Sequence, residues 1–254
     1  MFDSQPFFVG SFRILTVFVC ASISLPSFAQ EASDEINTTT GQAAKAAEGD
    51  AFVVGVADQT EVGALPAFTK GLSYKAAVAF GKGDWKTARD AYKKIVAESP
   101  RNALVLTNLA TVEQRLGELD SALAHLKTAL EVNPKIAQAW VLQGLIHFQK
   151  GDSNLAVSSL TRALHEDPLD ARAHNYLGVV TKEIGWVVGA EQELQRATEL
   201  DPDYGDAHFN LALLYLEKRP PARELAKRHY QLALALGASP DKLVQDKIDG
   251  KKPE

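Results

Sequence analysis

Glycine, alanine and proline each return at a fixed interval of 34 positions, and this regularity restricts the fold more than any other feature of the sequence. They stand at Gly83, Gly117, Gly151 and Gly185, at Ala88, Ala122, Ala156 and Ala190, and at Pro100, Pro134, Pro168 and Pro202. Self-similarity at such a period indicates stacked, equivalent structural units. We number 34 places in each unit and set the units at 69–102, 103–136, 137–170, 171–204 and 205–238.

The unit 137–170 explains why each unit should be a pair of helices. Its bulky and small residues are three or four positions apart within each half, which is the spacing of one helix face. They are Trp140 (place 4), Gly144 (8), Ala156 (20), Leu160 (24) and Ala163 (27). A glycine between the halves lets the chain reverse, and the proline at place 32 ends the second helix because it lacks an amide hydrogen.

These places and this period resemble the tetratricopeptide repeat family. The resemblance implies an all-α, right-handed α-solenoid of about five helix-turn-helix repeats, spanning 64–238, that binds other proteins. The first repeat is atypical, with Ile95 where the others have alanine. In the fifth repeat, Arg219-Pro220-Pro221 replaces the turn glycine, and the second half fits only with a two-residue insertion. We expect 239–254 to form a short polar capping helix and a tail.

The first 29 residues differ from the rest. Arg13 precedes an apolar run that ends at Ser27-Phe28-Ala29, a pattern typical of a secretory signal peptide cleaved after Ala29. The run is too short and too polar for a membrane span, and Val19 disfavours a lipid anchor on Cys20. Cys20 is the only cysteine, so the exported chain would have no disulfide. We therefore predict a bacterial envelope protein, exported to the periplasm.

A leader at 30–63, rich in Ala, Gly, Thr and acidic residues, is expected to be flexible. Residues 51–56 form an apolar island in it, rich in β-branched side chains that favour an extended chain. We hypothesise that 52–56 fold back and occupy the binding groove of the array.

Catalytic motifs do not stand out. The Gly81-Lys82-Gly83 segment lacks the strand and helix context of a phosphate loop, and no serine lies in a nucleophile-elbow pattern. The net charge of −5 gives no reason to expect nucleic acid as a partner. We therefore expect no enzymatic activity and no cofactor, although the array could regulate a catalytic domain on another chain.

Two histidines tempt a metal interpretation, because His174 and His208 hold the same place in neighbouring repeats. The other four histidines are His125, His147, His165 and His229. Place 4 is filled elsewhere by Leu72, Leu106 and Trp140, so packed, hydrogen-bonded histidines are favoured over metal ligands. Zinc would also need a third and fourth ligand.

A basic group near the irregular fifth turn has two interpretations. It consists of Lys218, Arg219, Arg223, Lys227 and Arg228. Solvated side chains on a helix surface explain it most simply, and an acidic partner or anionic lipid headgroup is the sharper alternative.

The resemblance also implies where a partner would bind. In the family, the first helices of the repeats line a concave groove, and ligands contact places 2, 5, 6, 9, 12 and 13. The groove residues that we predict from it are Tyr74, Asn108, Thr111, Leu142, Leu145, Phe148, Asn175, Tyr176, Val179, Phe209, Asn210 and Leu213. Only Asn108 and Arg172 match the clamp by which some members hold the terminal carboxylate of chaperones, so we reject that ligand.

The predicted function is an exported adaptor that holds a polypeptide segment in an apolar groove, where asparagine amides could bind its backbone. A different interpretation stays open, in which the array is a self-associating scaffold or an assembly accessory of the cell envelope. No integral membrane span is expected after signal cleavage. The sequence does not name the partner.

Overall fold

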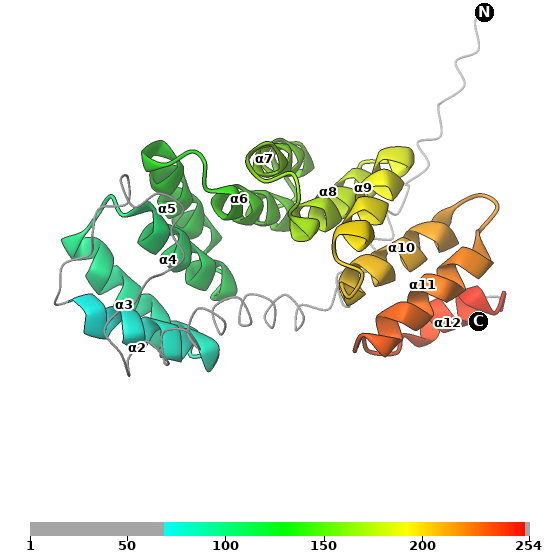
Figure 1. Ribbon diagram of the computed structural model, residues 1–254, viewed down its shortest axis with the longest axis horizontal. Coiled ribbons are helices and arrows are strands. Elements are labelled where there is room, and N and C mark those ends of the chain that lie inside the picture. Colours follow the sequence, from blue (N-terminus) through cyan, green and yellow to red (C-terminus); the bar gives the residue numbers. More distant parts are fainter. Residues whose placement is uncertain (1–68, 252–254) are drawn as a thin grey trace, which may run out of the picture.

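The computed structural model describes residues 69–251, which form eleven α-helices and no strand (Figure 1). The helices are α2 (Lys70–Gly81), α3 (Trp85–Glu98), α4 (Ala103–Arg115), α5 (Leu119–Val132), α6 (Ala137–Gln149), α7 (Ser153–Glu166), α8 (Ala171–Glu183), α9 (Val187–Leu200), α10 (Gly205–Glu217), α11 (Arg223–Ala235) and α12 (Lys242–Ile248). The predictions on 1–29, 30–63 and 51–56 lie outside the described residues.

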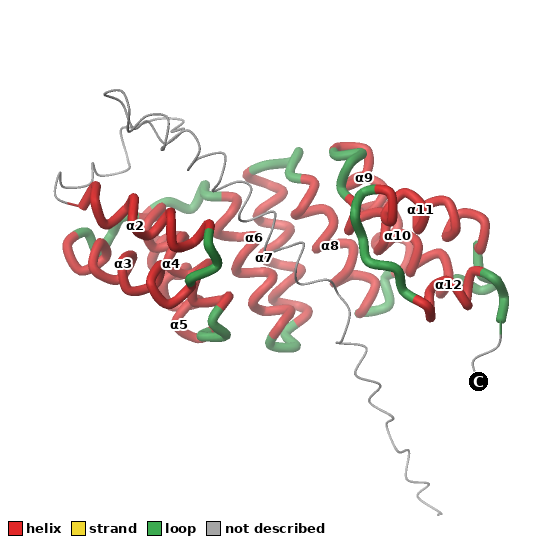
Figure 2. The backbone as a smooth tube through the Cα atoms, turned by 90° about the horizontal axis from the view of Figure 1, so that it is seen from below, coloured by secondary structure: helices red, strands yellow, loops and turns green. Residues whose placement is uncertain are grey.

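Ten of these helices pair into five hairpins, one for each predicted repeat. The second helix of each hairpin also packs against the first helix of the next, so the hairpins follow one another along the length of the molecule (Figures 1 and 2). The all-α repeat fold predicted from the 34-residue period is confirmed.

Four turns inside the hairpins depend on glycine. Gly83, Gly117, Gly151 and Gly185 have φ angles of 70°, 77°, 83° and 88°. Residues with a Cβ rarely adopt this left-handed conformation, whereas glycine does so without a steric penalty. The glycine spacing therefore marks the places where the chain reverses.

Small residues at place 8 let the two helices of a hairpin come close. A Cβ added to Gly178 would lie 2.6 Å from Leu194 Cγ and 3.1 Å from the carbonyl oxygen of Ala190. A Cβ added to Gly144 would lie 2.7 Å from Leu160 Cγ. The leucine at place 24 thus fills the space that a larger residue at place 8 would need.

The core repeats with the sequence. Side chains at places 20, 24 and 27 of the second, third and fourth repeats are completely buried, namely Ala122, Leu126, Ala129, Ala156, Leu160, Ala163, Ala190, Leu194 and Ala197. Ile95, at place 27 of the atypical first repeat, is also buried and packs with Phe80 and Tyr92.

The fifth hairpin differs from the others. Its helices are joined by residues 218–222 without a glycine, and Ala226, Tyr230 and Ala233 are buried at places shifted by two. The predicted insertion is therefore confirmed.

The capping helix α12 is less polar than expected. Val244 and Ile248 are buried against the last hairpin, because they cover apolar side chains of α10 and α11. The backbone N–H of Asp241 donates to the Tyr230 hydroxyl, which lies 2.6 Å away and anchors the start of α12.

Candidate interaction surface

The first helices of the hairpins form one continuous face of the array. Besides its hairpin partner, α4 contacts α6, α6 contacts α8, and α8 contacts α10. We call the surface that α4, α6, α8 and α10 form, on the side away from the second helices, the inner face. Helices α5, α7 and α9 lie on the other side of the layer (Figure 1).

Of the twelve predicted groove residues, nine keep part of their side chains accessible and three do not. Tyr74 on α2 is the most exposed, at 54%. The other eight are half-buried, namely Asn108, Leu145, Phe148, Tyr176, Val179, Phe209, Asn210 and Leu213. Thr111, Leu142 and Asn175 are buried, so they pack within the array and offer little surface to a ligand.

Asparagine amides bridge neighbouring first helices on the inner face. Asn210 Nδ2 donates to Asn175 Oδ1 at 2.9 Å, and Asn175 Nδ2 donates to the Tyr204 hydroxyl at 3.2 Å. Asn175 is only 2% exposed, so its amide joins α8 to the fifth repeat and is not presented to a partner. Sequence periodicity could place these residues on one face, but it could not show that they bond one another.

The half-buried apolar side chains form a row over the last three hairpins. Phe148 and Tyr176 pack on the core between the third and fourth hairpins. Val179, Phe209 and Leu213 pack on the core of the fourth and fifth. Each side chain therefore has one side fixed by packing and another open to solvent. Rigid, partly exposed aromatic side chains are typical anchors of protein interfaces.

Arg115 lies at the end of α4 and was missed in the sequence-based selection. Its place in the repeat, 13, is one of the ligand-facing places of the family, so the signal was present. Burial lowers the pKa of its guanidinium to about 10, partly offset by the Tyr176 phenol. Its Cζ atom is 5.9 Å from the centroid of the Trp85 ring, a distance that allows a cation–π interaction.

In three repeats, the side chain at place 4 is hydrogen-bonded to the carbonyl oxygen of the proline that precedes the repeat. Trp140 Nε1 donates to the carbonyl oxygen of Pro134 at 2.8 Å. The Nε2 atoms of His174 and His208 lie 3.1 and 3.0 Å from the carbonyl oxygens of Pro168 and Pro202, which are the equivalent prolines. The structural role that we predicted for these histidines is confirmed.

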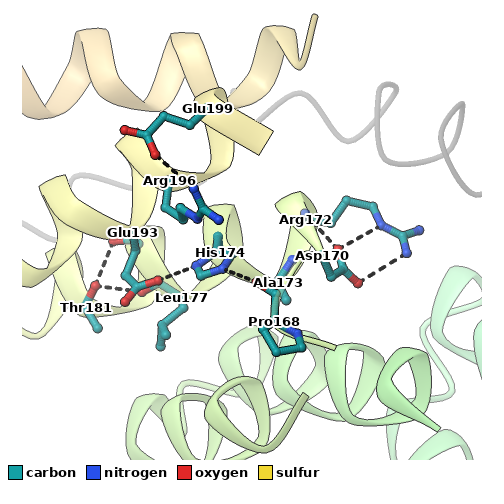
Figure 3. A network of polar contacts seen from close by, with 11 residues as sticks. Pro168, Asp170, Arg172, Ala173, His174, Leu177, Thr181, Glu193, Arg196 and Glu199 are labelled. Atoms are coloured by element: carbon teal, nitrogen blue, oxygen red, sulfur yellow. Dashed lines mark hydrogen bonds and ion pairs between the residues drawn. The ribbon is translucent and has the colours of Figure 1, made fainter. Parts of the chain in front are cut away.

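The second nitrogen of His174 bonds a carboxylate (Figure 3). Its Nδ1 lies 2.6 Å from Glu193 Oε2 on α9. Burial lowers the pKa of His174, but the hydrogen bonds to Glu193 and to the Pro168 carbonyl outweigh this effect and raise the pKa above its ordinary value.

Glu193 stands at place 23. In four of the hairpins the side chain at this place contacts a polar side chain on the first helix, and we call this contact a polar bridge. His125 Nδ1 is 2.7 Å from Glu113 Oε2, and Ser159 Oγ donates to Gln143 Oε1 at 3.1 Å. In the fifth hairpin, His229 takes the corresponding place and bonds His208. Each bridge ties the second helix to its own first helix, although the partners change from repeat to repeat.

The described residues do not gather into a metal site. No group of three or more His, Cys, Asp and Glu side chains within 69–251 could hold a metal ion. In the same part of the chain, no helix is both long and apolar enough to cross a membrane.

Comparison with known proteins agrees with this geometry. The tetratricopeptide repeat sequence profiles match residues 79–146 and 137–168. Together with five stacked hairpins, these matches decide the architecture. This is a tetratricopeptide repeat fold. Arrays with this fold are scaffolds for protein interaction. No curated protein sequence matches the chain significantly.

Solved structures give the same fold. Pseudomonas aeruginosa PilF superposes with a TM-score of 0.64 at 18% identity, over 72% of this chain and 83% of that chain. MamA from Desulfovibrio magneticus RS-1, residues 41 to the end, has a TM-score of 0.58 at 20% identity, over 70% and 100%. YrrB, described as a tetratricopeptide repeat protein with an unusual peptide-binding site, has a TM-score of 0.52 at 20% identity, over 71% and 96%. At these identities, the comparison concerns the fold alone.

Proposed function

We propose that the protein is an exported adaptor whose inner face binds an extended or helical segment of another envelope protein. The observation that carries this proposal is the row of half-buried apolar side chains on α6, α8 and α10, at Leu145, Phe148, Tyr176, Val179, Phe209 and Leu213. Covering their open sides with an apolar partner would stabilise the complex by about 25 cal/mol for each Å² removed from water.

The dimensions of the array suit a short segment. Packed helices lie about 8–10 Å apart, so α6, α8 and α10 present a row about 20 Å long. An extended chain advances about 3.3 Å per residue, and about six residues would span this row. Asn210 lies beside the row, and its side-chain amide is of the kind that can bond a peptide backbone.

One solved structure also supports a polypeptide partner. YrrB, which has the same fold, has a peptide-binding site according to its description. Export to the periplasm remains a prediction from residues 1–29, and fractionation of cells that express the full chain would test it.

Capture of partners from the native envelope, followed by calorimetry with the captured partner, tests the proposal. Tyr176→Ala should weaken binding by about 2 kcal/mol or more, because it removes an aromatic anchor near the centre of the row. Leu169→Ala is the matched control. Leu169 is exposed in the loop between α7 and α8 and is not among the inner-face residues, so binding should not change. Equal affinities of Tyr176→Ala and the parent protein would remove the inner face from the proposal.

The leader adds a second expectation to this function. If 52–56 occupy the inner face, removal of residues 30–62 should strengthen binding of the partner, since an internal competitor is lost. Unchanged affinity would argue against internal occupancy without affecting the adaptor function itself.

A further inference from the structure

One edge of the array, where first helices turn into second helices, is charged in the first three hairpins. The residue after the turn glycine is Asp84, Glu118 or Asp152. Glu118 pairs with Arg89 of the preceding hairpin, and Asp120 pairs with Lys150 of the following one. We call this side of the molecule the turn edge.

The turn edge changes character at the fourth hairpin. Trp186 takes the place of the acidic residue, and Val187 and Val188 follow it at the start of α9. These three consecutive side chains are 60%, 42% and 72% exposed. Helix α9 has no side-chain cap and no acidic residue in its first turn. It therefore lacks the favourable interaction between a negative charge and the positive end of the helix dipole.

Two ion pairs hold the elements next to this apolar segment together. Lys182 Nζ at the end of α8 lies 3.0 Å from Glu217 Oε1 at the end of α10, and Lys218 Nζ lies 2.6 Å from Glu191 Oε2 on α9. These contacts place the loop of residues 218–222, with its exposed Arg219, next to the fourth turn.

The end of α12 reaches the same edge. Arg223 Nε at the start of α11 donates to the carbonyl oxygen of Lys247 at 3.3 Å. Both Arg223 and Lys247 are exposed. The C-terminal part of the chain is also basic as a whole, because residues 218–254 contain nine Lys and Arg against five Asp and Glu, whereas the whole chain contains 27 against 32.

We propose that this part of the turn edge docks on an anionic phospholipid surface. Trp186, Val187 and Val188 would insert at the level of the headgroups, where the amphipathic indole ring is favoured. Arg219 and its basic neighbours would attract the lipid phosphates. The inner face lies on a different side of the hairpins, so this inference does not depend on the proposed adaptor function, and a docked molecule could still bind a partner.

Co-sedimentation of the purified protein with vesicles tests this docking. We expect binding to vesicles of phosphatidylcholine mixed with phosphatidylglycerol, little binding to phosphatidylcholine alone, and weaker binding at high salt because salt screens exposed charges. Tryptophan fluorescence should shift to shorter wavelength on binding. Trp186→Ser should reduce vesicle affinity at least about tenfold and abolish the shift, because Trp85 and Trp140 remain packed in the array.

Two further variants test whether binding depends on the position of the apolar side chain and on the basic charge. Leu155→Ser replaces an apolar side chain on α7 that is 51% exposed, against 60% for Trp186, and should bind vesicles like the parent protein. Arg219→Glu should weaken binding to the anionic vesicles. The proposal is overturned if the parent protein does not sediment with anionic vesicles, if it binds both kinds of vesicle equally, or if Trp186→Ser, with unchanged circular dichroism, binds as well as the parent.

Discussion

His208 and His229 face each other in the last hairpin, with their Nδ1 atoms 3.0 Å apart and their rings stacked at a centroid distance of 5.2 Å. The Pro202 carbonyl oxygen, 3.0 Å from His208 Nε2, can only accept a hydrogen bond. His208 therefore carries its proton on Nε2, and its Nδ1 accepts the N–H of His229 when both rings are neutral. Two fully protonated rings would instead bring two donors together.

Acid should therefore destabilise the last hairpin. Burial, followed by the nearby His208 and Arg228, lowers the pKa of His229 to about 4. In the unfolded chain a histidine titrates near about 6.5, so below that pH the unfolded state binds the proton more readily. The stability that neutral His229 contributes is present above about pH 6.5 and is lost as the pH falls toward about 4, by no more than about 1.4 kcal/mol per pH unit.

Urea unfolding measured near pH 7 and near pH 5 checks this expectation. His229→Gln should lose much of the extra acid sensitivity, because glutamine has no proton to gain. Tyr215 lies 5.6 Å from the His229 ring and Lys218 lies over Tyr215, so the variant should keep both of these neighbours. An unchanged difference between the two pH values in His229→Gln would contradict the role of this pair.

The equivalent histidine in the fourth repeat should respond in the opposite direction. The pKa of His174 is raised, chiefly because its bonds to Glu193 and the Pro168 carbonyl outweigh burial. Its contribution to stability is therefore complete below the pKa of the unfolded chain and is lost as the pH rises through the higher folded pKa. Glu193→Gln should lower the pKa of His174, measured by NMR titration, because the variant loses the carboxylate that raises it. A His174 pKa that does not move would assign the shift to another group.

The hydrogen bond from place 4 to the proline carbonyl gives a substitution test at Trp140. Because histidine makes the same bond in the next two repeats, Trp140→His should keep a donor near Pro134, whereas Trp140→Phe should lose it and cost about 1 kcal/mol. The indole is only half-buried, so Trp140→Ala should cost less than about 3–5 kcal/mol, the value typical of a buried tryptophan. Thermal unfolding of the three variants measures this order. Equal stability of the Phe and His variants would show that the bond contributes little.

The sequence predicts those features of the structure that recur in each repeat. Gly185 in the turn and Ala190 in the core have equivalents in each of the first four hairpins, so the spacing of these residues located the turns and the buried faces. Asn175 and Leu142 have ligand-facing places, yet they are buried, because burial depends on the side chains of neighbouring repeats and on how close the helices come. A period cannot report such contacts.

The polar bridges could not be predicted from the sequence either. Glu193 lies at a place where other repeats have His125, Ser159 or His229, so no residue type marks this place in the sequence. Only the helix pairing shows that each of these side chains meets a polar partner on its own first helix. Similarly, Trp186 departs from the acidic residue at its place, but its exposure could be known only from the packing around α9.

The close approach of α8 and α9 provides the last prediction. Gly178→Ala would add a Cβ 2.6 Å from Leu194 Cγ, so the helices must separate or the leucine must leave its preferred rotamer. Overpacking of this kind costs about 1–3 kcal/mol. Gly189→Ala is the matched control on α9, because no atom lies within 4 Å of its added Cβ. Alanine should stabilise that helix by up to about 1 kcal/mol. The midpoint of chemical unfolding should therefore fall for Gly178→Ala and rise for Gly189→Ala. A Gly178→Ala variant as stable as the parent would mean that α8 and α9 are less tightly packed than this geometry requires.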